Sequence, residues 1–85
     1  MHDTLLIEKI YQSIAALCRQ NKISKVNVLK IEVDEGSHIE GQHLLSHLID
    51  RDSAMFGDWT TVHVEHKPYE KLTAIIKSID GDNCE

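Results

Sequence analysis

Along this chain, the spacing of apolar residues switches between the period of a helix and the period of a strand. The order in which these two patterns occur limits the folds that the chain can adopt. Residues 4–21 carry an apolar stripe at helical spacing, formed by Leu6, Ile7, Ile10, Ile14, Leu17 and Cys18. We therefore expect a helix there, with Asp3 or Thr4 as its N-cap. Residues 25–33 then alternate, as a strand with one buried face does. The inward positions of this strand are Leu29, Ile31 and Val33.

The middle of the chain predicts a second helix. Residues 34–36 interrupt the strand, and Ser37 and Glu40 then stand at the spacing of a capping box. An apolar stripe follows, formed by Leu44, Leu45, Leu48 and Ile49. We expect this helix to run to about Asp50, with residues 51–58 as a polar connection.

Two further strands are expected in the last third of the chain. Residues 60–65 alternate, with two valines facing the core, and Pro68 has no N–H to donate to a sheet, so this strand stops near it. Residues 72–79 give the last strand. We expect residues 81–85 to form a flexible tail.

The order helix, strand, helix, strand, strand predicts an α+β fold. A chain of 85 residues forms one small domain, which we place at residues 1–80. The helical crossover between the first two strands predicts parallel pairing, and the short turn before the last strand predicts a hairpin. We therefore expect a three-stranded mixed β-sheet with both helices on one face.

Composition excludes several classes of function. The net charge is −5, and no basic stripe accompanies the few aromatic residues, so nucleic acid is not an expected partner. No apolar run exceeds five residues, so we expect no membrane partner and a cytoplasmic location. Cys18 and Cys84 form no Cys-x-x-Cys pair, which argues against structural zinc and a disulfide. No nucleophile and base can be paired from spacing, so an enzyme is not expected.

The first three residues offer a compact set of metal ligands. Met1-His2-Asp3 places a free amine, the backbone nitrogens of His2 and Asp3, and the imidazole of His2 within three consecutive positions. Nitrogen-rich, square-planar sets suit Ni(II) or Cu(II). The alternative interpretation is that the histidine at the start of the chain is there by chance and has no function.

These features resemble the HypA/HybF family of hydrogenase nickel-insertion accessory proteins. The resemblance runs through residues 1–80, in the order of Met1-His2-Asp3, the amphipathic helix, the strand Val26–Val33, Ser37-x-Ile39 and Val62-x-Val64-Glu65-x-x-Pro68. Ala74–Asp80 looks like the strand that returns after the family's zinc module. The resemblance therefore implies the nickel-binding domain alone, with the zinc module replaced by the turn at residues 68–71.

The resemblance implies a function and a set of ligands. The function is that of a nickel-binding metallochaperone, which holds Ni(II) transiently at Met1, His2 and Asp3 for a [NiFe]-hydrogenase client, with a nickel-handling GTPase as partner. Glu40 and His38 are possible further ligands, although Glu40 also suits the capping box. The alternative is a protein-interaction or regulatory module that kept the fold and binds a partner through its exposed sheet face or residues 51–58. The oligomeric state is left open.

The remaining histidines have other interpretations. His43 and His47 are four apart on the second predicted helix, so they share a face, a spacing that can hold a metal. We interpret them as exposed or partly buried residues that pack beside the apolar stripe. His63 is expected on the solvated face of the sheet and His66 at a strand end, so these two do not converge. Cys18 is expected in the core.

Overall fold

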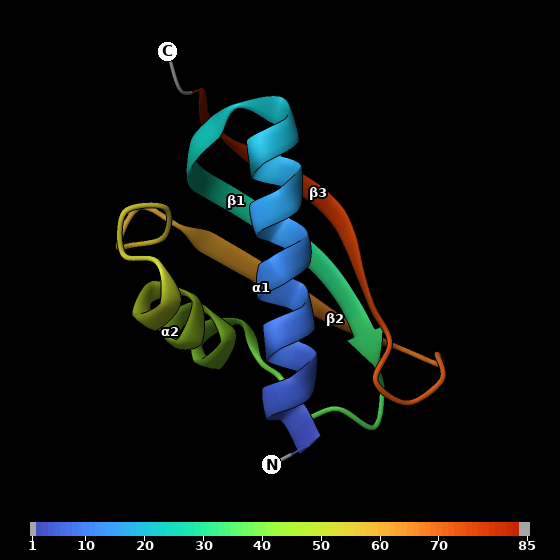
Figure 1. The fold of residues 1–85 in the computed structure, drawn as a ribbon. Coiled ribbons are helices and arrows are strands. Elements are labelled where there is room, and N and C mark those ends of the chain that lie inside the picture. The colour runs from blue at the N-terminus through green and yellow to red at the C-terminus, as the bar shows by residue number, and fades with distance from the viewer. Residues whose placement is uncertain (1, 84–85) are drawn as a thin grey trace.

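A computed structural model describes residues 2–83 of the chain, with side chains from Thr4 onward. Five elements follow one another along the chain (Figure 1). They are α1 (His2–Asn21), β1 (Ile23–Asp34), α2 (Gly41–Arg51), β2 (Thr61–Lys67) and β3 (Ala74–Asn83). The expected α+β class, with two helices and a three-stranded mixed sheet, is confirmed. In the described part of the chain, no helix combines the length and apolar character needed to cross a membrane.

β1 is the central strand of the sheet, whose order is β2-β1-β3. β2 runs parallel to β1, with Val64 opposite Ile31, as a crossover through α2 predicts. β3 runs antiparallel along the other edge of β1, with Ile79 opposite Leu29. The expected hairpin between the last two strands is therefore wrong, because β2 and β3 are not neighbours.

The β2–β3 connection, residues 68–73, passes the end of β1 instead of turning tightly. Asp34 N–H donates to the Thr73 carbonyl at 3.1 Å, and Glu35 N–H donates to the Lys67 carbonyl at 2.8 Å. A six-residue segment reaches up to about 20 Å, twice the roughly 9.6 Å between two strands that flank a third. The connection is therefore long enough to give the most apolar strand a neighbour on each edge.

Side chains fix the β2–β3 connection on both sides. The Tyr69 hydroxyl donates to the Glu32 carboxylate on β1, and the Lys9 ammonium on α1 donates to the Leu72 carbonyl at 3.5 Å. The hydrogen bond to Glu32 raises the pKa of Tyr69. The connection therefore links this end of the sheet to α1.

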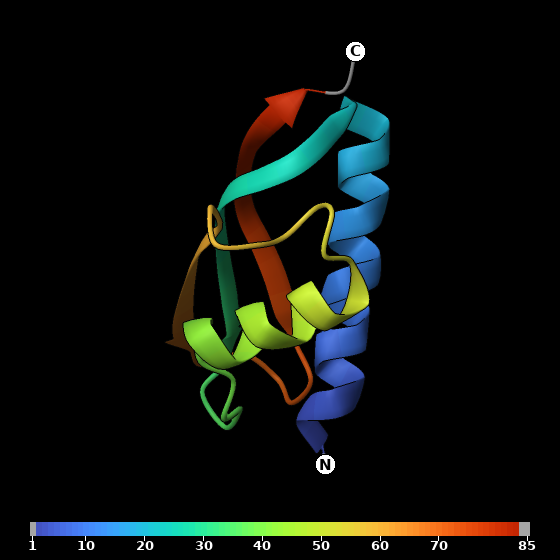
Figure 2. The same ribbon diagram turned by 90° about the vertical axis from the view of Figure 1, so that its left-hand side faces the viewer.

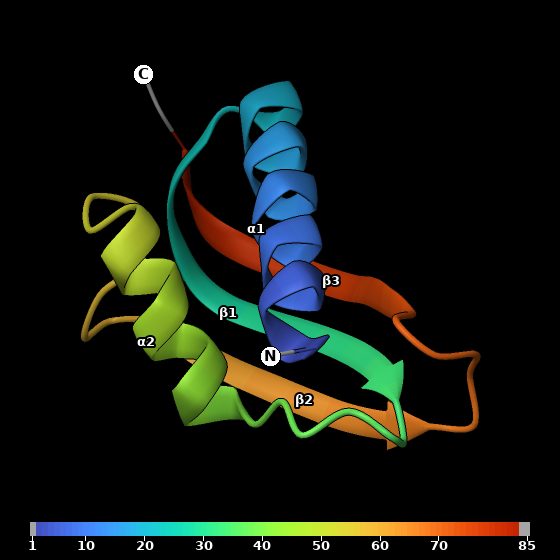
Figure 3. The ribbon, with the colours of Figure 1, turned by 60° about the horizontal axis from the view of Figure 1, so that its bottom comes forward.

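Both helices lie on one face of the sheet, as expected (Figures 2 and 3). α1 contacts β1 and β3, and α2 contacts β2. The fully buried large side chains between these layers are Phe56, Leu6, Ile10, Ile14, Leu29, Ile31, Ile39, Leu44, Leu48, Val26, Val33 and Cys18. The opposite face of the sheet carries exposed polar residues, including Lys30 and His63, which lie opposite each other on β1 and β2.

The α2–β2 loop, residues 52–60, is part of the core and not the polar connection that we expected. Phe56 is fully buried, and the Met55 carbonyl accepts a hydrogen bond of 2.9 Å from the Val26 N–H. Val26 is itself buried because a register shift just after it brings its side chain to the same face as Leu29. Strict alternation of apolar and polar residues along the sequence predicts neither Phe56 nor Val26 as a core residue.

Thr60 fixes the α2–β2 loop through its hydroxyl. Its Oγ1 donates to the Val26 carbonyl at 2.7 Å and accepts from the Gly57 N–H at 3.1 Å. We expect Thr60→Val, which keeps the shape of the side chain, to lower the free energy of unfolding by about 1–3 kcal/mol, because two buried groups lose their partner. Thr61→Val, at the exposed neighbouring position, should stay within about 0.5 kcal/mol. Urea denaturation measures both variants, and equal effects would contradict this role for the hydroxyl.

β3 continues beyond its expected end. It runs to Asn83, with Gly81 opposite Val26, so residues 81–83 belong to the sheet and not to the flexible tail that we expected. The last two residues of the chain lie outside the described part. A Cβ atom at Gly81 would lie 2.0 Å from the Lys25 carbonyl oxygen, so only glycine allows the strands to approach this closely beside the register shift.

Candidate metal centre

Of the primary nickel ligands proposed from sequence, His2 and Asp3 belong to the first turn of α1. The helix begins at His2, so neither Asp3 nor Thr4 is its N-cap, and helical backbone replaces the separate segment that we expected before the helix. Met1 and the side chains of His2 and Asp3 lie outside the described residues. The first backbone N–H groups of a helix have no carbonyl partner within it. The amide nitrogens of His2 and Asp3 are therefore not used by helical hydrogen bonds.

The β1–α2 loop, residues 35–40, lies at the same end of the molecule as the start of α1 (Figures 1 and 2). This loop carries His38 and Glu40, whose side chains are both exposed. The fold therefore places the backbone of His2 and Asp3 and the two further candidate ligands at one end of the domain.

Glu40 does not form the expected capping box. It is the N-cap residue of α2, with extended backbone angles (φ −123°, ψ 159°), and its side chain makes no capping hydrogen bond. The Ser37 hydroxyl instead accepts a hydrogen bond of 3.0 Å from the Ile39 N–H, which forms a local turn. Because α2 begins only at Gly41, Ser37 lies too far from the helix to cap it. The Glu40 carboxylate is thus not committed to the helix start.

α2 contacts the first half of α1 through an ion pair. The Arg51 guanidinium pairs with the Glu8 carboxylate and lies 4.7 Å from the centre of the Tyr11 ring. The hydrogen bond to Glu8 raises the pKa of Arg51, which therefore stays charged. Among the described residues, Oε2 of Glu8 is buried without a hydrogen-bond partner. A cavity of about 120 Å³ lies at this contact, and its lining includes Thr4 and His47.

His43 and His47 lie one turn apart on α2, and their imidazoles converge. Their Nε2 atoms are 3.2 Å apart, and the ring centres are 4.7 Å apart with an angle of 74° between the planes. Leu44 and Leu48, which are fully buried, form the inner side of the same helix. The predicted sharing of one helix face is confirmed, whereas the meeting of the two ring nitrogens is a finding of the structure. We call these two residues the histidine pair.

Cys18 belongs to the core, as expected. Its side chain is buried, and burial raises the pKa of the thiol, which disfavours the thiolate form that binds metals. Cys84 lies outside the described residues. Among the side chains that the structure describes, no group of three or more His, Cys, Asp or Glu residues is placed to hold a metal ion.

We expect the purified chain to contain no stoichiometric zinc and to keep its melting temperature after treatment with a chelator. A structural zinc site needs about four Cys or His ligands at fixed geometry, and the described apolar core forms without one. Elemental analysis and thermal denaturation with and without EDTA test this expectation. One chelator-resistant zinc per chain, or unfolding by EDTA, would show that a metal is part of the fold.

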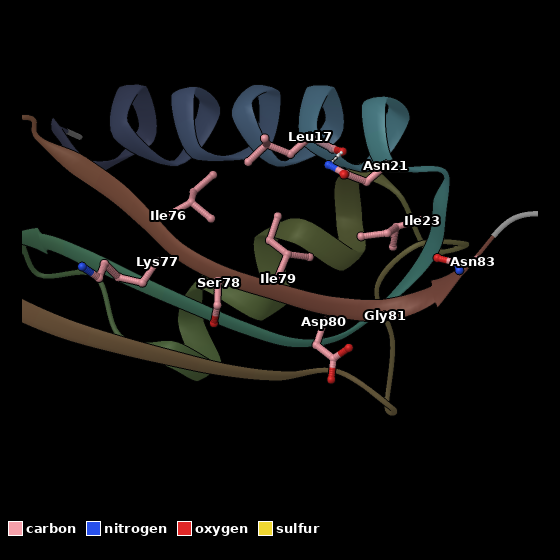
Figure 4. Close-up of a pocket in the computed structure, with 10 residues that line it drawn as sticks. All are labelled: Leu17, Asn21, Ile23, Ile76, Lys77, Ser78, Ile79, Asp80, Gly81 and Asn83. Atoms are coloured by element: carbon pink, nitrogen blue, oxygen red, sulfur yellow. Dashed lines mark hydrogen bonds between the residues drawn. The ribbon is translucent and has the colours of Figure 1, made fainter.

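A groove of about 480 Å³ lies between the last turns of α1 and β3 (Figure 4). Ile76 and Ile79 point from β3 toward the helix, whereas Asp80 points away from it. Leu17, which the helical stripe placed in the core, is instead 36% exposed and lines this groove. Because β3 is an edge strand, its outer backbone groups are unpaired within the sheet beside an apolar wall. Such a groove suits an extended chain segment.

Comparison of this chain with protein-family models, with curated proteins and with solved structures finds no match. The resemblance to the HypA/HybF family therefore depends on the sequence features of residues 1–80 alone.

Proposed function

We propose that this chain binds Ni(II) at its N-terminus and passes the ion to a client nickel enzyme. The start Met1-His2-Asp3 carries this proposal, because it supplies an amine, two amide nitrogens and an imidazole within three residues. Such a nitrogen set suits square-planar Ni(II). The resemblance to the HypA/HybF family suggests the client and partner, a [NiFe]-hydrogenase large subunit and a nickel-handling GTPase in the cytoplasm.

The position of these ligands suits transient binding. Consecutive residues at a chain start offer the same atoms in the folded and in the unfolded chain. A metal ion that binds both states equally changes the free energy of unfolding little. Release of nickel would then leave the domain folded, which a delivery protein requires.

The β1–α2 loop offers further ligands for the same ion. His38 and Glu40 are exposed at the end of the molecule where α1 starts. An imidazole or a carboxylate from this loop would take one position in the square plane in place of an amide nitrogen, so the ion would stay four-coordinate. We propose these two residues as additional ligands and Met1, His2 and Asp3 as the primary set.

Nickel titration of the untagged chain tests this function. We expect one Ni(II) per chain to show the absorption and the diamagnetism of square-planar coordination, whatever nickel binds elsewhere. Acidification should weaken this binding, because the amine, the imidazole and the two amide nitrogens must lose their protons before they can bind the metal. Titration that yields only paramagnetic, six-coordinate nickel, or none, would contradict the N-terminal site.

A protein-interaction module is the second candidate function, and the groove beside β3 favours it. Four apolar side chains among its polar lining, and the edge of β3, together suit a peptide that adds a strand to the sheet. The α2–β2 loop is less suited to a partner, because Phe56 is committed to the core. Retention of partner binding by a chain that lacks nickel binding would favour this second function.

A further inference from the structure

We propose that the histidine pair, His43 and His47, is a second metal site, which takes a divalent first-row transition metal ion such as Ni(II), Cu(II) or Zn(II). The site uses neither the Met1 amine nor the His2 side chain. It therefore goes beyond the N-terminal function proposed above, and either site can exist without the other.

The distance between the two ring nitrogens carries this inference. Metal–imidazole bonds measure about 2.0–2.1 Å, so two nitrogens bound to one ion at an angle of 90–109° lie about 2.8–3.4 Å apart. The Nε2 atoms of His43 and His47 are 3.2 Å apart, which lies inside this interval. One ion can thus bind both rings without a large change in the backbone of α2.

The protonation chemistry of the pair is compatible with metal binding. Two neutral imidazoles that face each other through Nε2 share one proton, which one ring donates and the other accepts. When the donating ring moves its hydrogen to Nδ1, both Nε2 lone pairs become free and a metal ion can bind them, at a position to one side of the line between the two nitrogens. No net loss of a proton from two neutral rings is required. Acidification adds a proton to a ring and competes with the metal.

The surroundings of the histidine pair favour a cation and leave room for water. Glu40 lies three residues before His43 and Asp50 three residues after His47, and both carboxylates are exposed. By helical spacing, Asp50 stands on the same side of α2 as His47. The nearby Arg51 is paired with Glu8. Because the structure describes only two converging ligands, water molecules would complete the coordination and the ion would exchange readily.

The two proposed sites differ in magnetic behaviour, which allows one titration to separate them. Two imidazoles with several water ligands form a weaker ligand field than four nitrogens, so Ni(II) there is six-coordinate and paramagnetic. Ni(II) at the N-terminal set is square-planar and diamagnetic. Paramagnetic nickel broadens the NMR signals of the rings that bind it, and diamagnetic nickel does not.

The experiment is a Ni(II) titration of the full chain and of its His2→Ala variant, followed by NMR of the histidine side chains. We expect broadening of the His43 and His47 ring signals in both proteins at the same nickel concentrations, with His63 unaffected. Broadening that is absent, that is lost in His2→Ala, or that centres on another histidine would overturn the proposal.

A sequence swap provides the matched control. Gln42→His combined with His43→Gln keeps the composition and the number of histidines but places the two rings five residues apart, on different sides of the helix. We expect nickel affinity at the pair to fall at least about tenfold, since even residues that only orient a metal ligand cost 10- to 100-fold when replaced. An unchanged affinity in a folded swap variant would show that convergence of the two rings is irrelevant, which overturns the site.

Discussion

His2→Ala is expected to abolish the square-planar nickel signal of the untagged chain. The substitution removes the only side-chain nitrogen among the first three residues and leaves the amine and the amide nitrogens in place. Because the amine alone binds Ni(II) weakly and an amide nitrogen must lose its proton to become a ligand, the remaining set should not retain the ion near neutral pH. Absorption and NMR titrations with Ni(II) measure the loss.

Extension of the chain before Met1 is the matched control for this prediction. An extension of several residues converts the Met1 amine into an amide and moves the new amine out of reach of the ion at His2, so the signal should also disappear, whereas a single added residue would again offer an amine, two amide nitrogens and the His2 imidazole. His63→Ala, on the exposed face of the sheet, should bind nickel like the wild type. Equal square-planar signals in the wild type and in His2→Ala would place the site elsewhere and remove the basis of the proposed function.

Phe56→Ala is expected to have the largest effect on stability. Phe56 is fully buried, although it lies in the α2–β2 loop and not in a helix or strand. Removal of a buried phenylalanine ring costs about 3–5 kcal/mol, whereas a domain of this size has a total stability of about 4–13 kcal/mol. We therefore expect a large fall in the melting temperature, or an unfolded chain, which thermal and urea denaturation would measure.

Leu5→Ala is the control for Phe56→Ala. Leu5 is 65% exposed on α1, and alanine is a good helix former, so its free energy of unfolding should change by less than about 0.5 kcal/mol. Similar destabilisation by both substitutions would mean that the α2–β2 loop does not contribute to the core. Nickel titration of an unfolded Phe56→Ala chain also separates the two metal sites, because the histidine pair needs α2 and the N-terminal set does not.

The spacing of apolar residues predicted the helices and strands of this fold because that spacing is a local property of the sequence. Leu29, Ile31 and Val33 occupy the buried face of β1, where alternation placed them. The strand order could not be obtained in the same way, since it depends on where the β2–β3 connection runs. Val26 and Phe56 were missed as core residues because a register shift and a long-range loop contact bury them.

The candidate metal sites were predictable only in part. Spacing placed His43 and His47 on one helix face, but side-chain conformations decide whether their ring nitrogens meet. Ser37 and Glu40 have the spacing of a capping box but do not form one. A capping box needs a helix that begins directly after its first residue, whereas α2 begins only at Gly41, after both residues. A short motif therefore predicts a helix cap only where the first residue of the helix is known as well as the residue types.

The central position of β1 has a consequence for synthesis of the chain. β1 leaves the ribosome early, but both of its neighbouring strands come from the last third of the described sequence. Its two backbone edges therefore stay unpaired until residues 61–83 emerge, since contacts distant in sequence form last. Folding of this sheet is thus expected to wait for the synthesis of residues 61–83, and until then both edges of β1 are open to pairing with other chains.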